Sequence, residues 1–198
     1  MIINTHGNRS NISNLAPGLY SFYQKTGYSY LLFDYPGYGA SSGDPSEENL
    51  YKSLDSIYNF AIKDLGYSPD KIILHGVSLG GAVAIEGLSK YPVRCGIIDS
   101  SFTNTVAVAK HLYSKWQVWR FIKPRFNSIK KIRKIETPVL FFHGTDDRVI
   151  PHHMSEELFA AKPGVKYIKL LKGFKHVDPR KINSEKVVKR FCQFVDNL

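Results

Sequence analysis

Short apolar runs separated by segments of helical period are the feature that most constrains the fold of this chain. Six such runs lie at residues 2–3, 30–33, 72–74, 96–98, 139–142 and 167–171. Most are almost wholly apolar rather than alternating, which is typical of strands covered on both faces. Strands that alternate with helices predict an α/β fold, a mostly parallel sheet with helices on both faces.

Helical signals lie between and after these runs. Asp44-Pro45-Ser46-Glu47 predicts a helix start with Asp44 as the cap, Pro45 at the first position and Glu47 three residues after the cap. The predicted helix has one buried stripe, formed by Leu50, Leu54, Ile57, Ala61 and Leu65. Further helices are predicted over residues 79–90 and 184–195. Residues 102–128 carry no strand signal and are predicted to form a helical, lid-like excursion from the sheet.

Length and composition narrow the class further. A chain of 198 residues without repeats or linkers is expected to form a single domain spanning residues 1–198. Its two cysteines, Cys95 and Cys192, are too few for a disulfide framework and suit a reducing compartment, so a cytoplasmic location is expected. Polar residues interrupt the most apolar stretch, 72–88, which excludes it as an ordinary membrane span.

The basic charge is concentrated in the second half of the chain. Residues 1–99 hold 7 Lys and Arg against 9 Asp and Glu, whereas residues 100–198 hold 20 against 8. Nine basic residues and no acidic one lie between Ser100 and Ile135. Such a segment forms either a solvated face or a surface for an anionic membrane or an acidic partner. No recognition motif accompanies it, so nucleic acid is not an expected partner.

The strongest chemical signal is Gly76-Val77-Ser78-Leu79-Gly80, which follows an apolar strand and opens a helix. This G-x-S-x-G context predicts that Ser78 lies on a sharp strand-to-helix turn, with small residues two positions away on either side to make room. The start of the following helix favours developing negative charge. Ser78 is therefore the predicted nucleophile.

A serine nucleophile needs a base and an orienting acid, and in this class of sheet they follow in the order Ser, Asp or Glu, His. Asp146 and Asp147 follow the strand at 139–142, and His176 follows the strand at 167–171. The spacing leaves both aspartates open. Of the seven histidines, His176 is the predicted base, because it alone follows both the serine and the acid in a loop after a strand.

Acyl transfer also needs N–H donors for the oxyanion. Leu79, the residue after the nucleophile, is one predicted backbone donor. Asn8, in the turn after the first strand, is the second. This chemistry requires no metal and no organic cofactor.

The chain resembles α/β-hydrolases of the serine-hydrolase subgroup that contains membrane-associated hydrolases and protein depalmitoylases. The matching pieces span almost the whole chain in the family's order: His6-Gly7-Asn8 with Asn11, Asp34-Tyr35-Pro36-Gly37-Tyr38-Gly39-Ala40-Ser41, Pro45-Ser46-Glu47, Gly76 to Gly81, His143-Gly144-Thr145-Asp146-Asp147 and His176. The resemblance implies that Ser78 is the nucleophile, Asp147 the acid and His176 the base, and that Asp34 holds a turn.

The resemblance also implies two further strands, often with a membrane anchor, ahead of the strand that ends in His6-Gly7. Relative to that pattern the fold is expected to be N-terminally shortened, with the first two strands missing. The strand around residues 31–33 would then lie at an open edge of the sheet. An apolar edge of this kind invites self-association.

These observations predict a serine hydrolase that cleaves a carboxylic ester or thioester of a small or acylated substrate. Trp116, Trp119, Phe121 and Phe126 in the excursion fit an apolar acyl chain, although they fit the packing of two short helices equally well. Two alternatives stay open. The same triad serves a peptidase or amidase, and a catalytically impaired remnant could bind lipid or a partner through the basic segment, as a membrane-peripheral protein.

Overall fold

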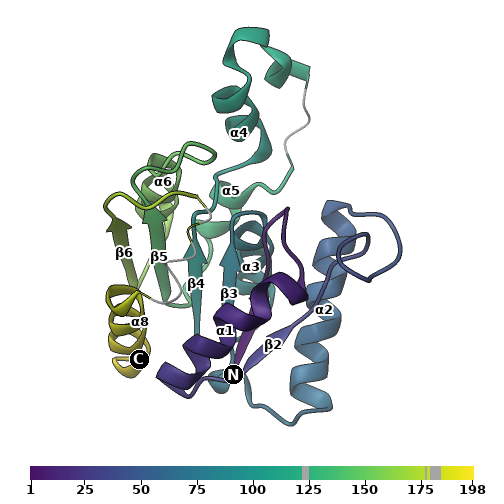
Figure 1. Ribbon diagram of the computed structural model, residues 1–198, viewed down its shortest axis with the longest axis vertical. Coiled ribbons are helices and arrows are strands. Elements are labelled where there is room, and N and C mark those ends of the chain that lie inside the picture. Colours follow the sequence, from purple (N-terminus) through teal and green to yellow (C-terminus); the bar gives the residue numbers. More distant parts are fainter. Residues whose placement is uncertain (122–124, 177, 179–183) are drawn as a thin grey trace.

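A computed structural model describes residues 1–121, 125–176, 178 and 184–198. Its centre is a six-stranded sheet in the order β2-β1-β3-β4-β5-β6 (Figure 1). All five neighbouring pairs are parallel, as predicted. The strands are β1 (Ile2–Thr5), β2 (Tyr30–Leu32), β3 (Ile73–Val77), β4 (Cys95–Asp99), β5 (Val139–Gly144) and β6 (Lys166–Leu171). Each of them matches one of the six apolar runs.

Helices cover both faces of the sheet. One face packs against α2 (Glu47–Lys63), α3 (Leu79–Lys90), α5 (Ser128–Ile132) and α6 (His153–Ala161) through a large apolar cluster that includes Leu54, Ile85 and Phe141. The other face packs against α1 (Ile12–Thr26) and α8 (Glu185–Asp196), where Phe22 and Phe191 meet edge to face at 5.2 Å. The two apolar faces explain why the strand sequences scarcely alternate.

The strand around residues 31–33 lies at one edge of the sheet, as expected, and β6 lies at the other. The two edges differ in sequence. β6 carries Lys166 and Lys169, and lysine on an edge strand discourages pairing with another chain. β2 has the sequence Tyr-Leu-Leu and lacks such a charge. Self-association through β2 stays a prediction, which sedimentation velocity over a range of protein concentrations tests.

Two features of the helices differ from the sequence prediction. Helix α1 is not one of the predicted helices. Pro17 lies inside it, and burial of Leu19 and Phe22 outweighs the hydrogen bond that proline removes. Helix α2 is capped by Ser46 rather than Asp44, since the Ser46 side chain accepts the Asn49 N–H at 3.1 Å.

The buried stripe of α2 is also shorter than predicted. The helix ends at Lys63, so Leu65 falls beyond it and is 44% exposed. Ile57 is half-buried, whereas Leu50, Leu54 and Ala61 are buried as predicted.

After β4 the chain leaves the sheet to form an arm, defined here as residues 104–121. The arm contains α4 (Thr105–Leu112) and two 3-10 turns, η2 (Ser114–Trp116) and η3 (Val118–Phe121). It stands away from the sheet at the top of Figure 1. No strand occurs at residues 102–121 or 125–128, and residues 122–124 of the predicted excursion lie outside the described residues.

Candidate active site

Ser78 lies on the sharp turn between β3 and α3 that the sequence predicted. Its backbone has φ 57° and ψ −117°, in the positive-φ region that costs a residue with a side chain about 1–3 kcal/mol. The turn is tight because glycines allow it. A Cβ at Gly80 would lie 1.8 Å from the carbonyl oxygen of Thr5, and one at Gly76 would lie 2.3 Å from the carbonyl oxygen of Gly80.

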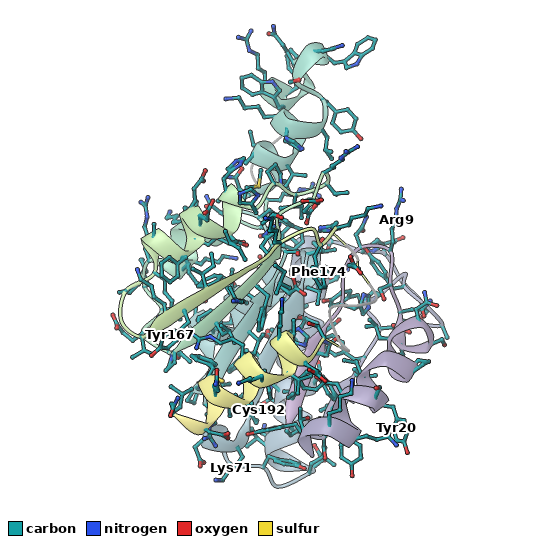
Figure 2. All side chains as sticks on the ribbon, turned by 60° about the vertical axis from the view of Figure 1, so that its left-hand side comes forward. Arg9, Tyr20, Lys71, Tyr167, Phe174 and Cys192 are labelled. Atoms are coloured by element: carbon teal, nitrogen blue, oxygen red, sulfur yellow. The ribbon has the colours of Figure 1, made fainter. Side chains whose placement is uncertain are left out.

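His176 comes from the loop after β6 and reaches the serine across 98 residues of sequence. Its Nε2 lies 3.0 Å from the Oγ of Ser78, and its Nδ1 lies 2.6 Å from Oδ2 of Asp147. Figure 2 labels Phe174, two residues earlier, near the ends of the strands from which this loop extends. The structure therefore brings Ser78, His176 and Asp147 together into one hydrogen-bonded chain.

The side chain of Asp147 is fully buried and heavily hydrogen-bonded. Its Oδ1 accepts the backbone N–H groups of Val149 and Ile150, both at 2.9 Å. Its Oδ2 is shared by His176 and His143, whose Nε2 lies 3.1 Å away. Burial alone would raise the pKa of this carboxyl group. The hydrogen bonds from His143, His176 and Ile150 outweigh burial and hold the pKa of Asp147 well below its usual range.

The geometry separates the two adjacent aspartates that spacing left open. Asp146 is exposed, and its side chain accepts a hydrogen bond from the Thr145 hydroxyl at 3.1 Å. Asp147 points inward to His176. Asp34 accepts the Ile12 N–H at 2.8 Å and so holds a turn.

The other histidines lie elsewhere. His6 bonds the carbonyl of Gly7, His75 bonds Asn4, and His111 bonds the carbonyl of Arg148. His152 and His153 lie near Glu156 and Glu157 at the start of α6. Of the seven histidines, all within the described residues, His176 is the one hydrogen-bonded to Ser78.

Sequence reasoning missed a contribution from His143. This side chain is completely buried. Its Nδ1 lies 2.6 Å from the Ser155 hydroxyl, and its Nε2 faces both Asp147 and the carbonyl of Ile150. Because both of those neighbours are acceptors, Nε2 carries the proton and donates. The spacing of four residues between His143 and Asp147 was the available signal.

The turn after β1 lies against the nucleophile. A Cβ at Gly7 would be 3.5 Å from the Cβ of Ser78. Asn8 and Leu79, the predicted oxyanion donors, line the same cavity as Ser78. Tyr38 lines this cavity too and holds the turn, since its hydroxyl donates to Oδ1 of Asn8 at 2.5 Å. Tyr38 was a second residue that sequence reasoning did not assign.

A cavity of about 500 Å³ opens beside Ser78. Its walls are largely apolar and include Leu50, Leu79, Phe102, Val108, Ala109, Leu112, Phe126, Val149 and Ile150. Glu47 stands at its wall and accepts the backbone N–H of Phe126 at 2.9 Å, which fixes the chain where it returns from the excursion. The cavity has the size and apolar lining of a site for a small organic group.

Within residues 1–121, 125–176, 178 and 184–198, no group of three or more His, Cys, Asp or Glu side chains is placed to hold a metal ion. In the same residues, no helix combines the length and apolarity that crossing a bilayer requires.

A parallel sheet with a serine on the turn after a central strand, and with His and Asp on loops after later strands, defines the α/β-hydrolase fold. Solved structures agree. The Pyrococcus furiosus esterase Pf2001 superimposes with a TM-score of 0.76 at 22% identity, covering 99% of this chain and 82% of that one. Residues 6–128 match the profile of the family described as "Alpha/beta hydrolase family", and the chain belongs to that family.

Two curated relatives place the chain within the family. Mouse (Mus musculus) alpha/beta hydrolase domain-containing protein 17C is 34% identical over 146 residues, which are 74% of this chain and 44% of that protein. The protein MT2364 of Mycobacterium tuberculosis is 30% identical over 189 residues, 96% of this chain and 66% of that protein. The chain thus spans less than half of 17C. The resemblance expected from the motifs is confirmed.

Proposed function

We propose that this chain is a serine hydrolase that cleaves a carboxylic ester or thioester through an acyl-enzyme intermediate. The observation that carries the proposal is the continuous hydrogen-bonded chain from Ser78 through His176 to Asp147, at 3.0 and 2.6 Å. These distances suit proton transfer from the hydroxyl to the imidazole.

In the first half-reaction, the Oγ of Ser78 attacks the substrate carbonyl carbon while Nε2 of His176 takes the hydroxyl proton. Asp147 keeps the imidazole oriented and stabilises its positive charge. The tetrahedral intermediate collapses, the bond to the alcohol or thiol breaks, and His176 returns the proton to that leaving group. Water then attacks the acyl-serine by the same route and releases the carboxylic acid.

The negative charge on the carbonyl oxygen needs donors during both halves. The backbone N–H groups of Leu79 and Asn8 are proposed for this role. Two observations support it: both residues border the cavity that contains Ser78, and Leu79 is the first residue of α3, where helix N–H groups point outward unpaired.

The apolar cavity favours an acyl group of hydrocarbon character. A fold neighbour named as an esterase agrees with an ester substrate. Amide cleavage by the same groups is the second candidate. Matched p-nitrophenyl ester, thioester and p-nitroanilide substrates with one acyl group separate the three, and the proposal expects the anilide to react slowest.

The direct test is labelling with a fluorophosphonate probe, which phosphonylates an activated serine. Wild-type protein is expected to react at Ser78, and Ser78→Ala to remain unlabelled. Ser89→Ala, at the far end of the same helix, is the matched control and should label normally. Unchanged labelling of Ser78→Ala would remove the assignment, and a folded wild type inert to the probe would favour the impaired remnant.

A further inference from the structure

The arm carries two large apolar side chains that the rest of the structure leaves in water. Trp116 is 79% exposed and Phe121 is 90% exposed, more than any other large hydrophobic side chain in the described residues. Both lie on the 3-10 turns that follow α4. Exposed aromatic groups gathered in one place mark an interaction surface.

The arm also carries cations, two of which lie over a third aromatic ring, that of Trp119. Lys110, Lys115 and Arg120 are all exposed on the arm. Lys110 Nζ lies 5.6 Å from the ring of Trp119, and the guanidinium carbon of Arg120 lies 5.4 Å from it. The sequence supplies no acidic residue from Ser100 to Ile135 to neutralise them. The surface of the arm is therefore both aromatic and positively charged.

Hydrogen bonds tie the arm to the segments around it, which are the returning chain at Arg125 and the loop after β5 at Arg148. Thr105 and Arg125 bond one another through the two backbones at 3.1 Å and through the Thr105 hydroxyl at 2.9 and 3.2 Å. His111 bonds the carbonyl of Arg148 at 3.1 Å. These contacts hold the arm upright, so that its tip points away from the sheet (Figure 2).

We propose that the arm docks on an anionic lipid bilayer, with Trp116 and Phe121 entering the interface and Lys115 and Arg120 contacting the headgroups. A bilayer interface offers this surface both things that it needs: negative charge for the cations and an apolar layer beneath it for the rings. An acidic surface without an apolar layer, such as duplex nucleic acid or polyglutamate, would satisfy the charge and leave Phe121 largely in water.

The docked arm would also bring the bilayer to the proposed active site. Leu112 and Tyr113 line the cavity beside Ser78, yet both are about half exposed on the arm. The cavity thus reaches the protein surface on the arm, the segment that also carries Trp116 and Phe121. An acyl chain leaving the bilayer would pass along these side chains to Ser78. Delivery of an acyl chain to Ser78 rests on the proposed function, whereas docking of the arm on the bilayer does not.

Tryptophan fluorescence measures docking without any label, because Trp116 and Trp119 are the two tryptophans of the chain. Ser78→Ala/Trp119→Phe protein reports Trp116 alone and cannot turn over lipid by the proposed route. With vesicles of phosphatidylcholine and phosphatidylserine at two to one, its emission is expected to move to shorter wavelength. Lipids brominated in the upper acyl chain should quench it. Emission that stays unchanged would overturn the proposal.

Co-sedimentation with the same vesicles assigns the surface. Trp116→Ser/Phe121→Ser is expected to weaken binding by about tenfold or more, because the rings no longer leave water. Lys115→Gln/Arg120→Gln should weaken it about 25-fold, from about fivefold for each cation near an anionic surface. High salt and vesicles of phosphatidylcholine alone should mimic the second variant.

Tyr20→Ser/Lys63→Gln is the matched control. Tyr20 is 62% exposed and, as Figure 2 labels it, lies at the end of the molecule opposite the arm. This variant should bind like wild type. Equal binding by the control and both arm variants would overturn the proposal. A second result would also overturn it. If vesicle binding depended on the cations but not on the rings, and RNA or polyglutamate displaced the protein from the vesicles, the arm would be a site for an acidic partner instead.

The two proposals fail separately. Protein that docks but ignores the fluorophosphonate probe refutes the proposed function and leaves the docking surface intact. Protein that labels at Ser78 but does not bind vesicles refutes the docking alone.

Discussion

Ser78, His176 and Asp147 sit on loops at the ends of β3, β6 and β5, whereas the arm stands away from the sheet, and both border one cavity. In the first region, half-buried Ser78 and His176 are linked by hydrogen bonds to buried Asp147, which is itself held by several hydrogen bonds. In the second, rings and cations face solvent. In the two proposals made above, this difference corresponds to two roles: the sheet ends position the reacting atoms, and the arm binds the surface from which substrate comes.

Ser78→Ala should have the largest effect in either region. Removing the nucleophile of such a unit lowers kcat by about 10⁴- to 10⁶-fold. Steady-state hydrolysis of a p-nitrophenyl ester measures it, and circular dichroism checks that the variant is folded. Residual activity within tenfold of wild type would mean that another group attacks.

Asp147→Asn should follow. An amide in place of the carboxylate disturbs the imidazole's orientation and charge balance, at a cost of about 10³- to 10⁴-fold in kcat. Asp146→Asn is the matched control and should change kcat less than twofold, since that carboxylate is exposed and accepts the Thr145 hydroxyl, whereas His176 bonds Asp147. The reverse ranking would assign the acid to Asp146.

Acid stability sharpens the same comparison. The pKa of Asp147 is lowered in the folded state, so the ionised carboxylate stabilises the fold fully above its unfolded pKa of about 3.9, and this stabilisation is lost as pH falls through the folded value. Between about pH 4 and 2, urea unfolding of wild type should lose stability more steeply than that of Asp147→Asn. Parallel slopes would contradict the buried, ionised carboxylate.

His143→Phe should lower kcat about tenfold, because it removes one hydrogen bond to a charged acceptor, worth about 1.5 kcal/mol. The KM for a soluble ester should hold, since His143 does not border the cavity. Ser155→Ala keeps the contact between His143 and Asp147 and should cost less. An unchanged kcat in a folded His143→Phe protein would show that His176 and the backbone alone position Asp147.

Substitutions in the arm should have the smallest effect on hydrolysis of a soluble substrate. Trp116→Ser/Phe121→Ser is expected to change kcat/KM for a short-chain p-nitrophenyl ester less than twofold, because neither side chain lines the cavity. The same variant should act poorly on an acylated substrate held in anionic vesicles. A large loss on the soluble ester would break the division between the two regions.

The features that the sequence predicted correctly depend on short segments of the chain. The six strands follow from apolar runs, and the turn at Ser78 follows from Gly76 and Gly80, whose positions leave no room for a side chain. The order of serine, acid and base along the chain follows from the parallel sheet, which gathers the loops after its strands at one edge.

What the sequence did not predict depends on contacts between distant segments. Helix α1 forms despite Pro17 because Phe22 packs on Phe191, 169 positions later. The choice of Asp147 over Asp146, and the roles of His143 and Tyr38, depend on which side chains meet when distant segments come together. Ser46 caps α2 in place of Asp44, a shift of two residues that spacing alone could not resolve.

Mass spectrometry of the acyl-enzyme tests the central claim most directly. Protein mixed with a p-nitrophenyl ester, quenched in acid within the first turnover and digested, should carry one acyl group on the peptide containing Ser78, formed in step with one equivalent of p-nitrophenol. Turnover with an unmodified Ser78 peptide, or with the acyl group on another residue, would contradict it.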